Sequence, residues 1–363
     1  MTAPTKSKTT KTATSTMQPT HTTPAAEPKP ATSARKTKRE RVFSGIQPTG
    51  TAHLGNYLGA IRNWVNEQDI YENIYCIVDL HALTLPREPA ELRDAIRRLA
   101  ATLLAAGIDT KRSALFVQSH VHEHAELTWI FDCITPLGWL NRMTQFKTKA
   151  GEDREAANAG LYTYPVLQAA DILIYQSDAV PVGEDQRQHI ELARDIASTF
   201  NFRFGETFVE PRALIREEGA RIMSLSEPEK KMSKSDNDAS YVALLDTPEV
   251  IRKKIARATT DSQRTIVFDE NRPGIYNLLT IYRLLGDETP QQIEQEFEGK
   301  GYKEFKAALA DRVVTALEPI RQRYEELMRD PAELDRLLAE GAARVRPIAA
   351  QTLRTAKERV GLL

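Results

Sequence analysis

One segment of the sequence carries the residue types that phosphate binding requires. Residues 43–57 read FSGIQPTGTAHLGNY and place Gly45, Gly50 and Gly55 five positions apart. Glycines let a backbone approach a ligand closely, and the start of a helix offers free N–H groups and the positive end of a dipole. His53 and Asn56 add donors that can follow charge moving across a phosphate. Taken alone, the segment fits a tight strand-to-helix turn with an exposed histidine equally well.

A second segment supplies cationic side chains. Residues 230–236 read KKMSKSD and form a short Ser-rich loop. Lys231 and Lys234, three positions apart, could clamp a triphosphate whose leaving group gains charge in the transition state. Taken alone, a solvated basic loop is an equally good interpretation, because most runs of like charge are exposed. Together, the two segments are a far more specific signal of phosphate chemistry than either is alone.

The pattern around both segments predicts an α/β protein. Short apolar runs alternate with amphipathic stretches, which is typical of a parallel sheet with helices on both faces. The expected strands of this part are residues 41–46, 74–78, 114–118 and 179–182, and the expected helices are residues 55–65 and 90–106. A further apolar stretch lies at 222–225. Later expected helices are residues 248–258, 273–285, 302–328 and 331–360. We therefore expect a Rossmann-type, doubly wound sheet domain with helical insertions over residues 41–240, and an all-helical domain over residues 241–363.

Residues 1–40 differ from the rest of the chain in composition. They contain twelve Thr and no Val, Leu, Ile or Phe, and they carry eight Lys or Arg against two acidic residues. Such a segment cannot bury enough apolar area to offset the entropy of ordering it, so we expect a disordered tail. The tail loosely resembles a mitochondrial transit peptide, but it lacks an apolar helical face, so targeting is the less favoured alternative.

Bulk properties exclude several classes of protein. The net charge of the chain is −1, although residues 1–40 carry +6 and the remainder −7. An acidic body can still bind nucleic acid if its basic residues gather on one face. Cys76 and Cys133 are the only cysteines, which excludes a disulfide framework and favours a reducing, cytoplasmic compartment. No apolar run is long enough to cross a bilayer, so no membrane partner is expected.

Both phosphate segments resemble the signature motifs of class I aminoacyl-tRNA synthetases. Residues 231–235 match the KMSKS loop of that family letter for letter. The HIGH element appears as HLGN, with Asn56 where many members have a second histidine, a departure usual in the tryptophan branch. The segments that resemble tryptophanyl-tRNA synthetases in particular are residues 143–147, 164–173, 182–186 and 189–192. The sister tyrosyl-tRNA synthetases share the fold and the lysine loop but lack the Gly-Ile-Gln-Pro-Thr-Gly form of the first motif.

The resemblance implies a two-step reaction. L-tryptophan attacks the α-phosphate of ATP to give tryptophanyl-adenylate and pyrophosphate, and the 3′-terminal ribose of the tryptophan tRNA then attacks the adenylate. The implied ATP-binding residues are Gln47, Pro48, Thr49, Gly55, Asn56, Gly183, Glu184, Asp185, Ile222, Lys231, Met232, Ser233, Lys234 and Ser235. The implied catalytic residues are Lys231, Lys234, His53 and Asn56, with Lys147 or Lys149 a weaker candidate for the phosphates. Mg²⁺ would bind mainly through ATP oxygens and water, and no protein metal site is expected.

The resemblance also implies a tryptophan pocket made of Phe43, His81, Tyr164, Gln168, Asp171 and Gln186. Asp171 is the expected reader of the indole, because a buried carboxylate needs a donor and indole has one N–H and no acceptor. An aspartate paired with a local Arg or Lys is the alternative. Tyr164 and Gln186 resemble ligands of the α-ammonium group. Gln168 stands where an apolar residue, often Met, is common, so the polarity of the indole pocket stays open.

Three alternating histidines, His120, His122 and His124, raise the question of a metal site. They lie where a strand gives way to a helix, and no second ligand cluster supports a metal. We therefore expect a solvated or capping turn rather than a metal site.

By resemblance, the C-terminal helices receive the tRNA anticodon and the chain forms a homodimer. Arg344, Arg346, Arg354 and Lys357 are the candidate contacts to tRNA. Three rival interpretations remain: a tyrosine-specific synthetase, a small-molecule adenylyltransferase with an HxGH-type loop, and a catalytically silent RNA-binding or regulatory paralogue. Intact lysines and glycines in the two motifs argue against the silent paralogue.

Overall fold

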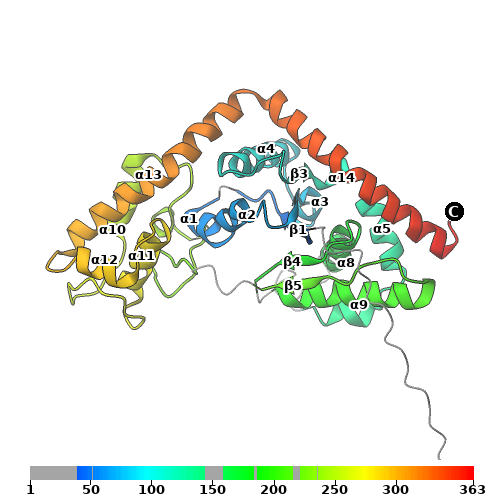
Figure 1. The fold of residues 1–363 in the computed structure, drawn as a ribbon, viewed down its shortest axis with the longest axis horizontal. Coiled ribbons are helices and arrows are strands. Elements are labelled where there is room, and N and C mark those ends of the chain that lie inside the picture. The colour runs from blue at the N-terminus through cyan, green and yellow to red at the C-terminus, as the bar shows by residue number, and fades with distance from the viewer. Residues whose placement is uncertain (1–38, 51, 144–157, 184–185, 216–220, 235) are drawn as a thin grey trace, which may run out of the picture. The chain divides into compact units, whose positions relative to one another are not determined.

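A computed structural model describes residues 39–50, 52–143, 158–183, 186–215, 221–234 and 236–363 (Figure 1). The expected 1–40 tail therefore lies almost wholly outside the described residues, as do Lys147 and Lys149. Among the residues that the structure describes, no helix is long and apolar enough to cross a membrane.

Five parallel strands form one sheet in the order β3-β2-β1-β4-β5. The strands are β1 (Arg41–Ile46), β2 (Glu72–Ile77), β3 (Ala114–Val117), β4 (Ala179–Pro181) and β5 (Arg212–Leu214). The order reverses between β1 and β4, which confirms the doubly wound α/β fold and places a ligand crevice at the carboxyl ends of these strands. The apolar stretch at 222–225 is not a strand, because Met223 forms only an isolated bridge with Lys231.

The helices of the sheet part follow the expected alternation. They are α1 (Leu54–Asn56), a π-helical turn η1 (Tyr57–Ile61), α2 (Arg62–Asn66), α3 (Asp79–Ala82), α4 (Pro89–Ala105), a 3₁₀ turn η2 (Gln118–His120), α5 (Glu123–Asp132), α6 (Leu137–Asn141), α8 (Ala159–Leu173) and α9 (Arg187–Phe204). The helix expected at residues 55–65 is present but passes through the π-helical turn.

The C-terminal part is helical, as predicted. Its elements are a 3₁₀ turn η4 (Asp238–Ser240), α10 (Pro248–Arg257), α11 (Pro273–Leu284), α12 (Pro290–Glu296), α13 (Tyr302–Arg329) and α14 (Pro331–Val360). The sequence pattern did not reveal α12, which has only seven residues.

Two of the apolar cores connect the two expected domains. The core that contains Phe43 and Phe116 also contains Val345 and Ala349 of α14. Helix α14 runs beside β3 and α5 (Figure 1). The core of the later helices includes Leu54 of α1. The last helix of the chain therefore packs on the sheet, rather than only on its helical neighbours.

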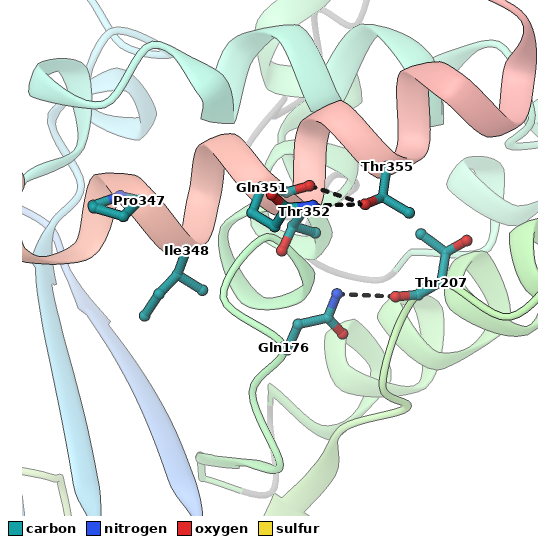
Figure 2. Close-up of a pocket in the computed structure, with 7 residues that line it drawn as sticks. All are labelled: Gln176, Thr207, Pro347, Ile348, Gln351, Thr352 and Thr355. Atoms are coloured by element: carbon teal, nitrogen blue, oxygen red, sulfur yellow. Dashed lines mark hydrogen bonds between the residues drawn. The ribbon is translucent and has the colours of Figure 1, made fainter.

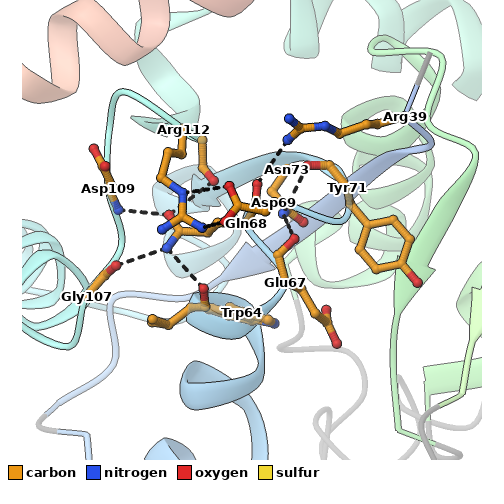
Figure 3. Close-up of polar contacts among 12 residues, drawn as sticks. Arg39, Trp64, Glu67, Gln68, Asp69, Tyr71, Asn73, Gly107, Asp109 and Arg112 are labelled. Atoms are coloured by element: carbon orange, nitrogen blue, oxygen red, sulfur yellow. Dashed lines mark hydrogen bonds and ion pairs between the residues drawn. The ribbon is translucent and has the colours of Figure 1, made fainter. Parts of the chain in front are cut away.

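A buried amide fixes the two turns that lead into β2 and β3 (Figure 3). The Gln68 side chain is fully buried, and its Nε2 donates to the carbonyl oxygens of Val65 and Gly107 at 3.2 and 3.0 Å. Its Oε1 accepts from the backbone N–H of Asp109 at 2.8 Å. Since Gly107 ends α4 in the left-handed region, with φ of 114°, this turn is held in a conformation that favours glycine.

Candidate functional site

A cavity of about 410 Å³ opens where β1, β2 and β4 end, which is the crevice that the strand order predicts. Its lining consists of Phe43, Gly45, Gln47, Val78, His81, Tyr164, Gln168, Asp171, Ile172, Val180, Pro181, Val182, Gly183 and Gln186. All six residues expected around tryptophan are among them, together with Gln47 and Gly183 of the expected ATP set. The structure therefore brings these residues together from β1, α3, α8 and the β4–α9 connection.

A second cavity, of about 450 Å³, lies against α14 (Figure 2). Its lining is neutral and consists of Gln176, Thr207, Pro347, Ile348, Gln351, Thr352 and Thr355. It contains no titratable side chain among the described residues and neither of the two phosphate motifs. The crevice at the strand ends is therefore the better candidate for chemistry.

The Asp171 carboxylate is the most deeply buried charge in the crevice, with a relative exposure of 1%. Its Oδ2 accepts a hydrogen bond from His81 Nε2 at 2.8 Å. Its Oδ1 accepts from Gln118 Nε2 at 2.6 Å and His124 Nδ1 at 2.7 Å. The alternative of a local Arg or Lys partner is therefore wrong, because two histidines and an amide hold the carboxylate.

These donors keep Asp171 ionised. Burial alone would raise the pKa of Asp171, but hydrogen bonds from His124 and His81 outweigh burial and hold the pKa well below its usual range. The crevice thus presents a fixed, negatively charged acceptor to a ligand that carries a donor.

His124 corrects an expectation drawn from the sequence. His120 and His122 are exposed, but the His124 side chain is fully buried, so the prediction of a solvated or capping turn is wrong for it. Gln118 was not among the predicted site residues, although it follows β3 directly and so stands at the carboxyl end of a strand. No group of three or more His, Cys, Asp or Glu side chains within the described ranges could hold a metal ion.

Tyr164 brings a neutral hydroxyl to the crevice. Its Oη lies 3.1 Å from His189 Nε2, and burial raises its pKa to about 12. The hydroxyl therefore keeps its proton at neutral pH. Gln186 lines the same cavity at the N-cap of α9.

The HLGN segment forms a capping box at the start of α1. His53 Nδ1 accepts from the backbone N–H of Asn56 at 3.3 Å, and Asn56 Oδ1 accepts from the backbone N–H of His53 at 3.0 Å. With Nδ1 occupied as an acceptor, the hydrogen of the neutral ring sits on Nε2. His53 is buried rather than exposed, and it is therefore prepared to donate from Nε2.

We expect His53 to give the stability of the chain a pH dependence. Burial, reinforced by Lys231 and Lys234, lowers the pKa of His53 from 6.5 to about 4. Because the pKa of the folded state lies below that of the unfolded state, the unfolded chain binds the extra proton between pH 6.5 and 4. The free energy of unfolding therefore falls as pH drops through this window, and His53 adds no slope above it. His53→Asn retains a helix-capping side chain and should reduce this slope in urea titrations; an unchanged slope contradicts the assignment.

The two phosphate motifs meet in space. Lys234 Nζ donates to the carbonyl oxygen of Thr49, and a Cβ on Gly50, whose φ is 64°, would overlap the Lys234 ammonium. Met232 is buried in the same core as Leu54, and its backbone N–H donates to the carbonyl oxygen of Ile222 at 3.0 Å. The lysine loop is thereby docked against the HLGN segment.

The remaining expected ATP-site residues are placed as follows. Pro48 is buried, Gln47 is exposed, and the carbonyl oxygen of Ser233 accepts from Ser240 Oγ at 3.2 Å. Gly55 packs against Met232, with 3.5 Å between its would-be Cβ and the Met232 Cβ. Glu184, Asp185 and Ser235 lie outside the described residues.

The basic side chains of α14 have partners within the chain. Arg346 Nε lies 3.0 Å from Glu123 Oε1, and Lys357 Nζ lies 2.6 Å from Glu126 Oε1, both on α5. Arg344 donates a hydrogen bond to the carbonyl oxygen of Thr110, and Arg354 forms an ion pair with Glu358. All four expected tRNA contacts are therefore engaged in intramolecular bonds.

Comparison with known proteins agrees with this geometry. The family described as tRNA synthetases class I (W and Y) matches residues 35–318. The tryptophan–tRNA ligase of Wolinella succinogenes is 54% identical over 326 residues, which cover 90% of this chain and 99% of that protein. The corresponding ligase of Gloeobacter violaceus is 55% identical over 328 residues, covering 90% and 98% of the two chains.

Solved structures of aminoacyl-tRNA synthetases share the fold of this chain. The tryptophanyl-tRNA synthetase of Campylobacter jejuni, complexed with ADP and tryptophan, superposes with a TM-score of 0.78 at 36% identity and covers 88% of this chain and 99% of its own. The tyrosyl-tRNA synthetase of Archaeoglobus fulgidus shares the fold at 20% identity, with a TM-score of 0.62 over 79% of this chain and 90% of its own. The chain therefore belongs to the class I tRNA synthetases for tryptophan and tyrosine, in the tryptophan–tRNA ligase branch.

Proposed function

We propose that this chain is a tryptophan–tRNA ligase that activates L-tryptophan with ATP and transfers it to the 3′-terminal ribose of tryptophan tRNA. The observation that carries the proposal is the ionised, buried Asp171 in a crevice that also contains Gln47, of the first phosphate motif. A carboxylate fixed in a pocket that also has apolar walls, among them Phe43 and Ile172, suits an amino acid with an aromatic side chain that has one N–H donor. The two docked motifs beside the crevice suit a triphosphate.

In the first step, the tryptophan carboxylate attacks the α-phosphate and pyrophosphate leaves. This chemistry needs positioning and charge stabilisation rather than a covalent nucleophile. Lys231 and Lys234 would neutralise the leaving pyrophosphate, and His53 would donate from Nε2. Asn56 would hold the His53 ring in place through the capping box. In the second step, by family resemblance, the 2′-hydroxyl of the ribose attacks the adenylate.

The remaining ATP contacts are proposed from the motif positions. Main-chain and side-chain contacts to the nucleotide are assigned to Gln47, Pro48, Thr49, Gly55, Gly183, Glu184, Asp185, Ile222, Met232, Ser233 and Ser235. Mg²⁺ would be held by ATP oxygens and water, which suits a cation that keeps most of its hydration shell.

Tryptophan would lie with its indole N–H on Asp171 and its α-ammonium group on Tyr164 and Gln186. Phe43 and His81 would form walls of the indole pocket. Gln168 lines the same cavity, so its amide would add a polar group beside the ring.

We further propose a cytoplasmic homodimer whose helical C-terminal part, residues 241–363, receives the anticodon. Both cysteines are free, which suits a reducing compartment. Trp129 on α5 and Leu137 on α6 are 70% and 67% exposed, and large exposed apolar side chains of this kind suit a subunit contact. Sedimentation of the full chain tests the dimer.

Exchange of pyrophosphate into ATP, measured with each of the twenty amino acids, tests the reaction. Exchange with tryptophan alone supports the proposal. Exchange with tyrosine would indicate a tyrosyl-tRNA synthetase, and no exchange with any amino acid would indicate a catalytically silent paralogue.

Lys234→Gln should lower kcat for tryptophan-dependent exchange about 10²–10³-fold, because one donor to charge developing in the transition state is lost. KM for tryptophan should change little, since Lys234 contacts Thr49 rather than the tryptophan crevice. Lys230→Gln is the matched control, because Lys230 is exposed and already paired with Glu227 at 2.6 Å. Equal losses in the two variants would contradict a specific role for Lys234.

A further inference from the structure

A chain of buried polar groups runs from the crevice into the core. His124 Nδ1 donates to Asp171 Oδ1 at 2.7 Å, and His124 Nε2 lies 2.7 Å from the hydroxyl of Tyr175. His124 and Tyr175 are fully buried. Neither of them lines the crevice, whereas Asp171 does. His124 and Tyr175 therefore act on a ligand only through Asp171.

The partner of one ring nitrogen of His124 decides whether that nitrogen carries a hydrogen. A carboxylate only accepts, so His124 must carry a hydrogen on Nδ1. Burial, with nearby negative groups including Asp171, raises the pKa of Tyr175 well above its usual range, so its hydroxyl keeps its proton. The Tyr175 hydroxyl, 2.7 Å from Nε2, is then a second hydrogen-bond partner of the ring and fixes its plane.

The hydrogen bonds to Asp171 do not occupy every acceptor site of its carboxylate. An ionised carboxylate offers about four lone-pair sites. Gln118 and His124 both bind Oδ1, whereas His81 alone binds Oδ2 among the described residues. Gln118 is itself held, because its Oε1 accepts from the backbone N–H of Leu80 at 3.1 Å. One acceptor site on Oδ2 thus stays open on an otherwise saturated group that faces the crevice.

Simple packing would not require this chemistry. Tyr175 lies among aromatic rings, 5.9 Å from both Phe43 and Phe116 between ring centroids, and His124 lies 6.1 Å from Phe116. An apolar side chain would fill such surroundings without the cost of burying an imidazole and a hydroxyl. The burial of the polar His124–Tyr175 pair is explained if this pair maintains the orientation of Asp171.

We propose that His124, held by Tyr175, is a positioning residue for substrate selection: it occupies Oδ1 of Asp171 and thereby turns the free acceptor site of Oδ2 toward the indole N–H. The inference rests on the proposed function. It adds a specificity determinant that lies outside the pocket wall.

The test compares tryptophan with 3-(benzothiophen-3-yl)-L-alanine, which has nearly the same shape but carries sulfur in place of the indole N–H. The ratio of their kcat/KM values in pyrophosphate exchange reports reading of the N–H alone. His124→Leu should lower this ratio roughly 10–100-fold, since a carboxylate that keeps only Gln118 on Oδ1 and His81 on Oδ2 is less firmly oriented toward a donor. KM for ATP should stay within about twofold, because the effect is confined to the amino-acid pocket.

Conservative variants separate positioning from support of the fold. His124→Asn keeps an N–H at the place of Nδ1 and should restore most of the ratio, and Tyr175→Phe should lower the ratio less than His124→Leu. His120→Leu is the matched control, because it makes the same change at an exposed position of the same turn. If His124→Leu fails to fold, Tyr175→Phe decides, and an unchanged ratio there overturns the inference.

A loss that is equal for both substrates also overturns it, because a purely structural role lowers both alike. Absence of tryptophan-dependent exchange in the wild type would instead overturn the proposed function. The two failures are therefore distinct.

Discussion

Asp171→Ala is expected to lower kcat/KM for tryptophan in pyrophosphate exchange by about 10⁴-fold, because a site built to hydrogen-bond its substrate depends on the buried partner. The variant removes the acceptor for the indole N–H. It also leaves the donors of His81, Gln118 and His124 facing one another without an acceptor. Each unsatisfied buried donor costs about 1–3 kcal/mol, so the pocket should lose its shape as well as its charge.

Two companion variants make this result specific. Asp171→Asn keeps the volume but offers a single amide oxygen to three donors, so it should be nearly as damaging as alanine. Asp195→Ala changes an exposed aspartate on α9 and should leave exchange unchanged. Thermal unfolding of each variant separates loss of fold from loss of recognition. Retention of tryptophan exchange within tenfold in a folded Asp171→Ala protein would mean that another group reads the indole.

The sequence predicted the sheet well where strands are long and buried. β1 was predictable at residues 41–46 because a short apolar run there ends at the turn-forming Gln-Pro-Thr-Gly segment, and four of its six residues are buried in the structure. β5 escaped detection, since it has three residues and none is buried. Its place at the edge follows from pairing with β4, which is a long-range contact that no local pattern records.

The site was predictable only where motif letters carried it. Asp171 and Lys234 were predicted as site residues from the motifs that contain them. His124 was wrongly predicted to lie in a solvated or capping turn, because it alternates with His120 and His122. His124, Leu127 and Phe131 are spaced so that they share one face of α5, and all three are fully buried. The partner of His124 lies 47 positions further on, so local reasoning could not supply the hydrogen bond that justifies its burial.

The contacts of the last helix, like the partner of His124, could not be predicted from local sequence. Residues 331–360 were predicted as a helix and form α14, yet helical periodicity does not name the surface that a helix covers. In the structure, α14 packs on β3 and α5 and is tied to α5 by Arg346–Glu123 and Lys357–Glu126. A local sign of this close contact was Gly341, a glycine in the interior of a long helix, where its low helix propensity needs a packing reason.

Gly341→Ala is therefore expected to lower the free energy of unfolding by about 3 kcal/mol or more, an effect far above that of most surface substitutions. A Cβ at this position would overlap the backbone carbonyl oxygen of Leu115, and β3 cannot retreat because it pairs with β2. The helix must move instead, which strains its ion pairs to α5.

Gly138→Ala is the matched control for that experiment. Gly138 is exposed in α6, and a Cβ there meets nothing within 4 Å, so the same substitution should stabilise the chain by about 0.5–1 kcal/mol through its better helix propensity. Urea unfolding of both variants measures the difference. Opposite signs at two helical glycines would show that close contact between α14 and β3, not helix propensity, decides position 341. If Gly341→Ala instead stabilises the protein as Gly138→Ala does, α14 does not lie as close to β3 as the structure places it.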